Sequence, residues 1–245
     1  MFTIERERGP RLEVLAYAPL GHRQLEAAAR LHADPALYDG IAWADAVSKP
    51  MPELDAGRRV ELRVRLCPIV RQRRPDAPGR HDEVDAWIHA QCEKLCGKPA
   101  KPTKAFFATL TEVREELQKK RRTDPAATDP RLLDREQVYA AWAVNLLERQ
   151  AGVIVQRDDG DPPAARVAVE GRRLLRLVRR NRERQATLIP PRRRDDIGDE
   201  GKPEALVRAT VSITDPAAFR QALARGVGRH RAFGFGMLLV KPAVG

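Results

Sequence analysis

The segment that most constrains this chain lies near its C-terminus, where four glycines are interspersed with basic residues before an aliphatic run. It reads Arg225-Gly-Val-Gly-Arg-His-Arg-Ala-Phe-Gly-Phe-Gly-Met-Leu-Leu-Val240. Glycine adopts positive φ at no steric cost and allows close backbone approach, while exposed amides and arginines suit a phosphate. The segment therefore predicts a loop that binds a polyanion. The residues expected to make this contact are Gly226, Gly228, Arg229, His230, Arg231, Gly234 and Gly236.

The residues on either side of this loop predict a strand, a helix, the loop and a second strand, in that order. Apolar and polar residues alternate over 207–213, which indicates a strand. Asp215 and Pro216 are typical of a helix start, and Gly226 is placed to end that helix. Phe233, Phe235, Met237 and Leu239 alternate again, so the last strand is expected to begin within the glycine-rich segment.

Residues 204–242 resemble the C-terminal half of the second ferredoxin-like domain in the Cas-six family of CRISPR repeat-processing endoribonucleases. The similarity is greatest to the E-subtype (CasE) members, whose loop pattern is matched by Gly226-Val-Gly-Arg229 and Ala232-Phe-Gly-Phe-Gly236. Residues 46–70 resemble, more weakly, the proline-containing strand of the family's first domain. The helix expected over 134–150 resembles the family's inter-domain region. The resemblance implies an α+β fold of two tandem ferredoxin-like (RRM-like) domains, and a glycine-rich loop that lies along RNA.

The 245 residues suit two domains of about 100 residues each. We expect an N-terminal ferredoxin-like domain over 1–96, a helical basic insertion over 97–133 and a C-terminal ferredoxin-like domain over 134–245. The periodicity of apolar residues predicts the elements inside these parts. These are strands over 12–17 and 59–70, and helices over 20–32, 82–96, 104–122 and 134–150.

The helix expected over 104–122 ends in four cations between proline-rich breaks, and we interpret it as an insertion that projects from the domain. The E-subtype pattern lacks such a helix, whereas relatives from type IV CRISPR systems carry an arginine-rich helical finger. A second basic run spans 166–184. The alternative for this second run is a solvated charged surface, and the alternative for the helix over 104–122 is contact with a protein partner instead of RNA. The residues expected to bind RNA here are Arg114, Lys119, Lys120, Arg121, Arg122, Arg179 and Arg180.

The net charge and the absence of membrane signals narrow the choice of partners. Lysine and arginine number 45 against 34 acidic residues, a surplus of +11 that favours nucleic acid or another anionic surface. No apolar run approaches the roughly 20 residues that span a bilayer, and the N-terminus does not resemble a signal peptide. Three cysteines without a disulfide framework fit a reducing compartment. We therefore expect a cytoplasmic protein that does not bind membranes.

The family resemblance implies a metal-independent ribonuclease, in which a 2′-hydroxyl attacks the adjacent phosphate and leaves a 2′,3′-cyclic phosphate. This reaction needs a base, an acid and cations around the phosphate. The counterpart of the E-subtype histidine is His22, with Tyr17 upstream and Arg23 beside it. If the residues around Tyr17 instead correspond to the segment after the catalytic helix, that histidine is missing and arginine must carry the reaction. The remaining alternative is that His22 is an ordinary polar residue in a first helical turn.

No metal or cofactor is expected. His89, Cys92 and Cys96 recur on one helical face, but a zinc site would need a fourth ligand, and buried thiols on an apolar helix are the commoner explanation. The sequence has no P-loop and no dinucleotide-binding fingerprint.

The sequence thus predicts an endoribonuclease that binds the stem-loop of a CRISPR repeat and cleaves precursor crRNA to mature crRNA. Its expected partners are the precursor crRNA hairpin and other subunits of the CRISPR effector complex. One alternative is a catalytically inactive RNA-binding subunit of a CRISPR ribonucleoprotein. A generic basic DNA-binding or ribosome-associated protein would explain the charge but not the order of elements around the loop.

Overall fold

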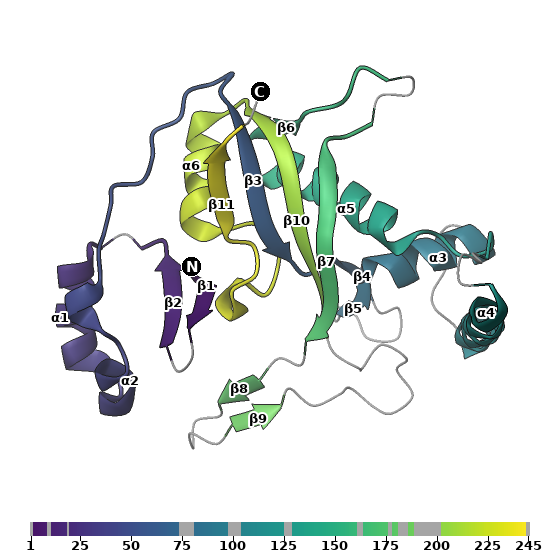
Figure 1. The fold of residues 1–245 in the computed structure, drawn as a ribbon, viewed down its shortest axis with the longest axis horizontal. Helices are drawn as coiled ribbons and strands as arrows, with labels where there is room; N and C mark the ends of the chain where they lie inside the picture. The colour runs from purple at the N-terminus through teal and green to yellow at the C-terminus, as the bar shows by residue number, and fades with distance from the viewer. Residues whose placement is uncertain are drawn as a thin grey trace.

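The computed structural model describes residues 2–8, 11–18, 20–73, 81–97, 104–124, 129–160, 164–175, 178–180, 186–188 and 202–243. It shows a mixed α+β fold, as expected, and the strand pairs among these residues are antiparallel. Figure 1 shows a central sheet, with the first hairpin and two helices on one side and a long helix far on the other.

The long strand β10 (Lys202–Ile213) is the centre of the main sheet. It pairs with β3 (Arg59–Leu66) along one edge, and with β6 (Val153–Val155) and β7 (Val167–Leu175) along the other. The last strand, β11 (Leu238–Pro242), pairs with the free edge of β3. The sheet therefore combines strands from both halves of the chain.

One face of this sheet forms the core because β3 and β10 alternate buried and more exposed residues. Helices α5 (Arg135–Gln150) and α6 (Pro216–Arg225) cover this face, and Leu147 and Leu223 from the two helices join the same core. Each fully buried Leu or Val contributes about 1.5–3 kcal/mol relative to an exposed one. The core residues of the two strands are Val60, Leu62, Val64, Leu66, Ala205, Val207, Ala209, Val211 and Ile213.

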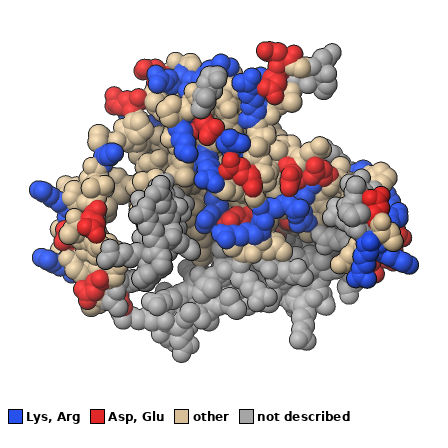
Figure 2. Space-filling view, viewed as in Figure 1, with Lys and Arg blue, Asp and Glu red and all other residues tan. Residues whose placement is uncertain are grey.

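The opposite face of the sheet carries charged side chains that neutralise one another. Figure 2 shows basic and acidic residues mixed over β3, β10 and β7. Arginines from all three strands lie within ion-pair distance of two glutamates, so much of the positive charge on this face is already compensated. The pairs join Glu170 to Arg63 and Arg208, and Glu204 to Arg65 and Arg173.

The N-terminal part of the chain begins with a hairpin of β1 (Phe2–Arg8) and β2 (Arg11–Ala16). Helix α1 (His22–His32) follows, then the short α2 (Pro35–Asp39) and a 3-10 turn over Trp43–Asp45. No residue of α1 is buried. These helices therefore add little to the main core.

A second hairpin links β3 to the helices. Strand β4 (Ile69–Arg73) pairs with β5 (His81–Asp85), and α3 (Ala86–Cys96) starts directly afterwards. The Asp85 carboxylate caps α3 by accepting a hydrogen bond from the amide of Trp87 at 2.8 Å. A short hairpin pairs β8 (Val178–Arg180) with β9 (Ala186–Leu188).

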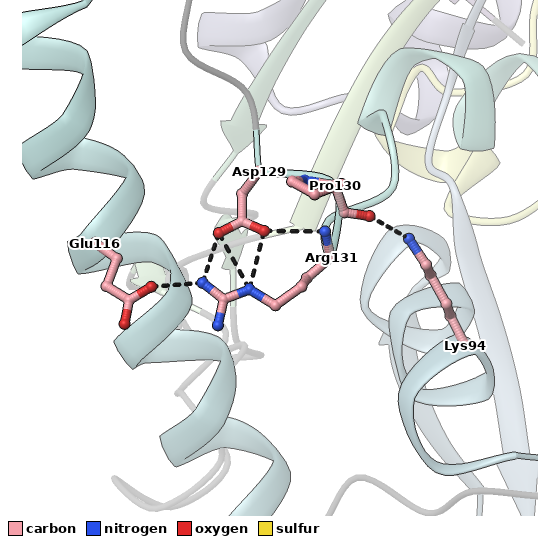
Figure 3. Close-up of polar contacts among 5 residues, drawn as sticks. All are labelled: Lys94, Glu116, Asp129, Pro130 and Arg131. Carbon is pink, nitrogen blue, oxygen red and sulfur yellow. Dashed lines mark hydrogen bonds and ion pairs between the residues drawn. The ribbon is translucent and has the colours of Figure 1, made fainter.

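The long helix α4 (Lys104–Thr123) is anchored through one face. Phe106, Leu110 and Val113 are buried, and the first two belong to the main core cluster. Figure 3 shows Arg131 between the carboxylate of Asp129 and that of Glu116 on α4. The Asp129 side chain is buried, and the Arg131 guanidinium holds the pKa of this carboxyl well below its usual range. The first half of α4 is thus packed, and its cationic end is the exposed part.

Three boundaries expected from the sequence are wrong. The strand expected over 59–70 ends at Leu66, because Pro68 cannot donate to a sheet ladder. The helix expected over 82–96 starts at Ala86, because the residues before it pair with β4. The last strand starts at Leu238, because Gly234 and Gly236 have positive φ, which breaks a strand.

The strand expected over 207–213 begins earlier, at Lys202. The strand over 12–17 and the helices over 20–32, 104–122 and 134–150 agree with the structure within one or two residues. The sheet includes β3 from the part of the chain assigned to the first domain. The division into domains over 1–96, 97–133 and 134–245, and their ferredoxin-like character, stay predictions.

Candidate RNA interface

The glycine-rich loop connects α6 to β11, and all four of its glycines have positive φ, between 71° and 83°. Residues other than glycine rarely adopt these φ values, because their Cβ atoms clash with the backbone. Gly226 ends α6, as the sequence predicts, with its amide bonded to the Ala222 carbonyl at 2.7 Å. His230 is the only described residue other than glycine with positive φ. Five residues from Gly226 to Gly236 therefore have positive φ, and they bend the backbone of the loop.

Close backbone contacts hold this loop in place. The Val227 amide donates to the Gly236 carbonyl at 2.9 Å, and the Gly236 amide donates to the Arg65 carbonyl on β3 at 2.7 Å. A Cβ atom on Gly236 would lie 1.8 Å from the Val227 carbonyl oxygen. At the other end of the loop, the Gly228 amide donates to the side-chain oxygen of Gln150 on α5 at 2.9 Å. The loop is thus fixed to both the sheet and α5.

His230 lies against a carboxylate from a distant strand. Its Nε2 atom is 3.1 Å from Glu83 on β5, and its side chain is only 18% exposed. Lys202 also contacts Glu83 at 3.0 Å, and Arg229 lies 3.5 Å away. The hydrogen bond from His230, followed by that from Lys202, lowers the pKa of Glu83 to about 2, although burial opposes the shift. Glu83 therefore anchors the basic part of the loop as a carboxylate.

The two arginines of the loop remain accessible. The Arg229 side chain is 40% exposed despite its contact with Glu83, and Arg231 is exposed while donating to the Arg225 carbonyl at 3.1 Å. Guanidinium groups suit phosphate because their donors form a planar fork. This loop can therefore present two cations on a backbone that is held rigidly. Whether His230 itself contacts RNA stays a prediction.

The three residues expected to be catalytic lie in the N-terminal part of the chain. The Tyr17 hydroxyl donates to the Leu238 carbonyl at 3.1 Å, which joins the end of β2 to the strand after the loop. His22 opens α1, and its Nδ1 atom lies 2.9 Å from the Ser48 hydroxyl. Arg23 is exposed. Among the described residues, neither His22 nor Arg23 makes a hydrogen bond or ion pair with the glycine-rich loop.

The two basic runs lie on different elements. Lys119, Lys120 and Arg122 are exposed at the C-terminal end of α4, whereas the side chains of Arg114 and Arg121 lie outside the described part of the structure. The backbone of Arg179 and Arg180 belongs to β8, and their side chains are likewise outside the description. The described residues thus place an exposed cationic cluster at the end of α4, far from the glycine-rich loop in Figure 1, whereas Arg166, Arg172 and Arg173 of the second run form ion pairs.

The histidine and cysteines of α3 do not assemble a metal site. The described residues contain no group of three or more His, Cys, Asp or Glu side chains that could hold a metal ion. Cys92 is fully buried, and this burial raises its pKa to about 12, which disfavours the thiolate that zinc requires. Cys96 is exposed, and His89 lies 3.8 Å from Glu93. Cys92 and Cys96 are therefore explained as residues of a partly buried helix face.

Sequence reasoning missed Glu83 because residues 82–96 were assigned to one helix. The turn residues over 75–79, which separate this segment from the preceding strand, were the available signal for a hairpin. No local pattern, however, indicates that Glu83 meets His230, since 147 positions separate them.

A sequence profile of the CRISPR associated protein family matches residues 2–242. The chain belongs to the family of CRISPR-associated proteins. This confirms the family resemblance expected from the sequence. No curated protein matches the chain. Among the described residues, no helix is both long enough and apolar enough to cross a membrane.

Several solved structures are similar to this CRISPR-associated protein. A CRISPR endoribonuclease Cse3 bound to 19-nucleotide RNA is 18% identical, with a TM-score of 0.41, over 80% of this chain and 62% of that one. A CRISPR-associated protein from Thermus thermophilus is 16% identical, with a TM-score of 0.45, over 99% of this chain and 77% of that one. Thermus thermophilus Cse3 bound to an RNA representing a pre-cleavage complex is 16% identical, with a TM-score of 0.41, over 99% and 78%. This chain thus spans less than two thirds of the first of these proteins.

Proposed function

We propose that this CRISPR-associated protein is a metal-independent endoribonuclease that binds the stem-loop of a CRISPR repeat and cleaves precursor crRNA. The 2′-hydroxyl next to the scissile phosphate is the nucleophile, and the products carry a 2′,3′-cyclic phosphate and a 5′-hydroxyl. After cleavage the protein stays on the mature crRNA as a subunit of the effector complex. Its partners are thus the repeat hairpin and other effector subunits.

One observation carries this proposal: in a chain of this family, the glycine-rich loop has five residues with positive φ, is held by hydrogen bonds to β3 and α5, and carries two accessible arginines. A loop of this kind can approach an RNA backbone closely while Arg229 and Arg231 neutralise its phosphates. Because Glu83 and Gln150 already hold the loop, little conformational entropy is lost when RNA binds.

For the chemistry, two assignments remain open on the same N-terminal segment. If His22 is the base or acid, it exchanges a proton with the 2′-hydroxyl or with the leaving 5′-oxygen. If arginine carries the reaction, Arg23 stabilises the charge that develops on the phosphate. Tyr17 supports both versions, because its bond to Leu238 holds this segment against the strand that follows the loop.

The test is single-turnover cleavage of the repeat RNA from the same genome, in excess EDTA, with analysis of the product ends. We expect one cut with a cyclic phosphate end. With histidine catalysis, His22→Ala lowers the rate by about 10²–10⁴. With arginine catalysis, His22→Ala cleaves almost normally whereas Arg23→Ala is severely slowed.

The same experiment separates this function from the inactive-subunit alternative. Tight hairpin binding without any cleavage, unchanged by either substitution, would mean that the chain is a catalytically silent RNA-binding subunit. Normal cleavage by both variants would move the active site elsewhere, with Arg229 and Arg231 the next residues to substitute.

A further inference from the structure

A cavity of about 690 Å³ lies where β4, α5 and the glycine-rich loop meet. Its walls come from three stretches that are far apart in the sequence: Ile69–Arg71, the face of α5 from Trp142 to Gln150, and Gly228–Arg229. The volume lies within the range of sites that hold small organic ligands. The cavity is on the α5 side of the loop and includes none of the residues expected to be catalytic.

The lining of this cavity is cationic. Arg71, Arg149 and Arg229 each contribute a guanidinium group from a different element, and the described lining contains no Asp or Glu. Within the described part of the chain, Arg71 and Arg149 have no carboxylate partner. Arg149 donates only to the carbonyl of Asn145 on its own helix, at 3.1 Å. Arg71 lies opposite Glu83 in the β4–β5 register without forming an ion pair, and Arg149 has no acidic neighbour in the lining, so the cavity keeps positive charge that favours an anion.

The same cavity also has an aromatic and apolar wall. Trp142 is half-buried, and Ile69, Val70 and Leu146 line the same cavity. An indole next to guanidinium groups offers a stacking surface for a nucleobase together with donors for a phosphate. A purely anionic ligand would use only the arginines, and a purely apolar ligand would leave their charge buried beside it. A nucleotide uses both.

We propose that this cavity binds one unpaired ribonucleotide, with its base against Trp142 and its phosphate between Arg71 and Arg149. The proposal rests on the proposed function, because Gly228 and Arg229 belong both to the cavity wall and to the candidate RNA loop. The hydrogen bond from the Gly228 amide to Gln150 fixes the loop at this wall. RNA that lies along the loop can therefore place a neighbouring unpaired nucleotide in the cavity.

The test compares two ligands on the full chain: the repeat hairpin with blunt ends, and the same hairpin with unpaired nucleotides added at its 5′ or 3′ end. We expect one of the tails to increase affinity by about tenfold, the size of one stacked base. Arg71→Gln combined with Arg149→Gln should remove this gain and leave the blunt-hairpin affinity unchanged. Trp142→Leu, which keeps an apolar side chain at that position, should also remove most of it.

A matched control removes the same charge elsewhere. Arg157→Gln combined with Arg220→Gln substitutes two exposed arginines outside the cavity and should keep the tail-dependent gain. Equal affinity for blunt and tailed hairpins in the wild type, or a gain that survives in the Arg71 and Arg149 variant, would overturn the proposal.

A free nucleotide shares the same base and phosphate chemistry, so adenosine 5′-monophosphate is tested by equilibrium dialysis. If the wild type binds no hairpin, the proposed function fails. In that case, monophosphate binding that is lost in the variant with both Arg71→Gln and Arg149→Gln would assign the cavity to free nucleotides. If the wild type gains no affinity from the tails and also binds no monophosphate, the cavity binds a nucleotide from neither source.

Discussion

At the scale of single residues, Gly236 and Glu83 decide the shape of the candidate interface more than the cations do. Gly236 packs its backbone against Val227, where no side chain fits. Glu83 holds His230, Lys202 and Arg229 at one point. The arginines give the loop its charge, but these two residues set where that charge is placed.

Replacing Gly236 by Ala should destabilise the fold. The new Cβ would lie 1.8 Å from the Val227 carbonyl oxygen, in a backbone conformation that alanine avoids. We expect a loss of at least about 3 kcal/mol in the free energy of unfolding, measured with urea. Gly171→Ala is the control, because Gly171 has negative φ and open space around it. An equally small effect of both substitutions would contradict the packing described for the loop.

Replacing Gly228 by Val should weaken RNA binding while the protein stays folded. Gly228 has a φ of 74° and is half-buried, and a Cβ there would meet only the end of the Leu146 side chain, at 3.3 Å. The valine distorts the loop and blocks backbone approach to RNA. Gly57→Val imposes the same backbone strain at a φ of 80°, outside the loop. If the two variants bind hairpin RNA equally well and give the same circular dichroism spectrum, the loop assignment is wrong.

Glu83 should make the stability of the protein depend on acid pH. Its folded pKa is lowered from 4.5 to about 2, so its stabilising effect is present above pH 4.5 and is lost as the pH falls towards 2. The Glu83→Gln variant has no carboxyl group at this position, so its stability lacks this contribution to the pH dependence. The wild type should therefore lose more unfolding free energy between pH 5 and pH 3 than the variant, measured with urea. Parallel losses would show that Glu83 is not held by His230 and Lys202.

At the scale of elements, α4 combines a structural half with an exposed cationic end. Phe106, Leu110 and Val113 are buried, and Arg131 ties the helix to the segment before α5. Deleting the helix would therefore expose the core. Its contribution to RNA binding is better tested by removing charge from its exposed end alone.

Substituting Lys119, Lys120 and Arg122 by Gln should weaken hairpin binding and flatten its salt dependence. If all three meet phosphates, the slope of log affinity against log salt should fall by about 2–3. Arg58→Gln, Arg157→Gln and Arg220→Gln together remove the same number of charges from exposed positions elsewhere and serve as the control. A slope equal to that of the wild type would mean that this end of α4 faces solvent or a protein partner.

Sequence reasoning succeeded for those elements whose signals are local. Asp215, Pro216 and Gly226 mark the two ends of α6, and their effects act within a few residues. It failed where two signals competed, as at Phe233 and Phe235, whose alternation suggested a strand although the neighbouring glycines bend the chain. It could not predict the pairing of β3 with β10 and β11, or the contact between Glu83 and His230, because these join distant residues.

At the scale of the whole molecule, the net charge is +11, and acidic residues neutralise the basic residues in some regions but not in others. On the open face of the sheet, arginines are paired with glutamates. In the glycine-rich loop, the cavity behind it and the end of α4, cations remain exposed or unpaired among the described residues. This distribution favours specific sites for a polyanion over uniform adsorption to any anionic surface.

The most direct test of the account is the affinity of the protein for the repeat RNA hairpin relative to a DNA duplex of the same sequence at equal salt. Charge alone attracts both ligands, whereas a rigid loop shaped for one backbone distinguishes them. We predict that the RNA hairpin binds at least about tenfold more tightly, a difference of 1.4 kcal/mol. Equal affinity for the two ligands would contradict the account and leave the protein as a general binder of nucleic acids.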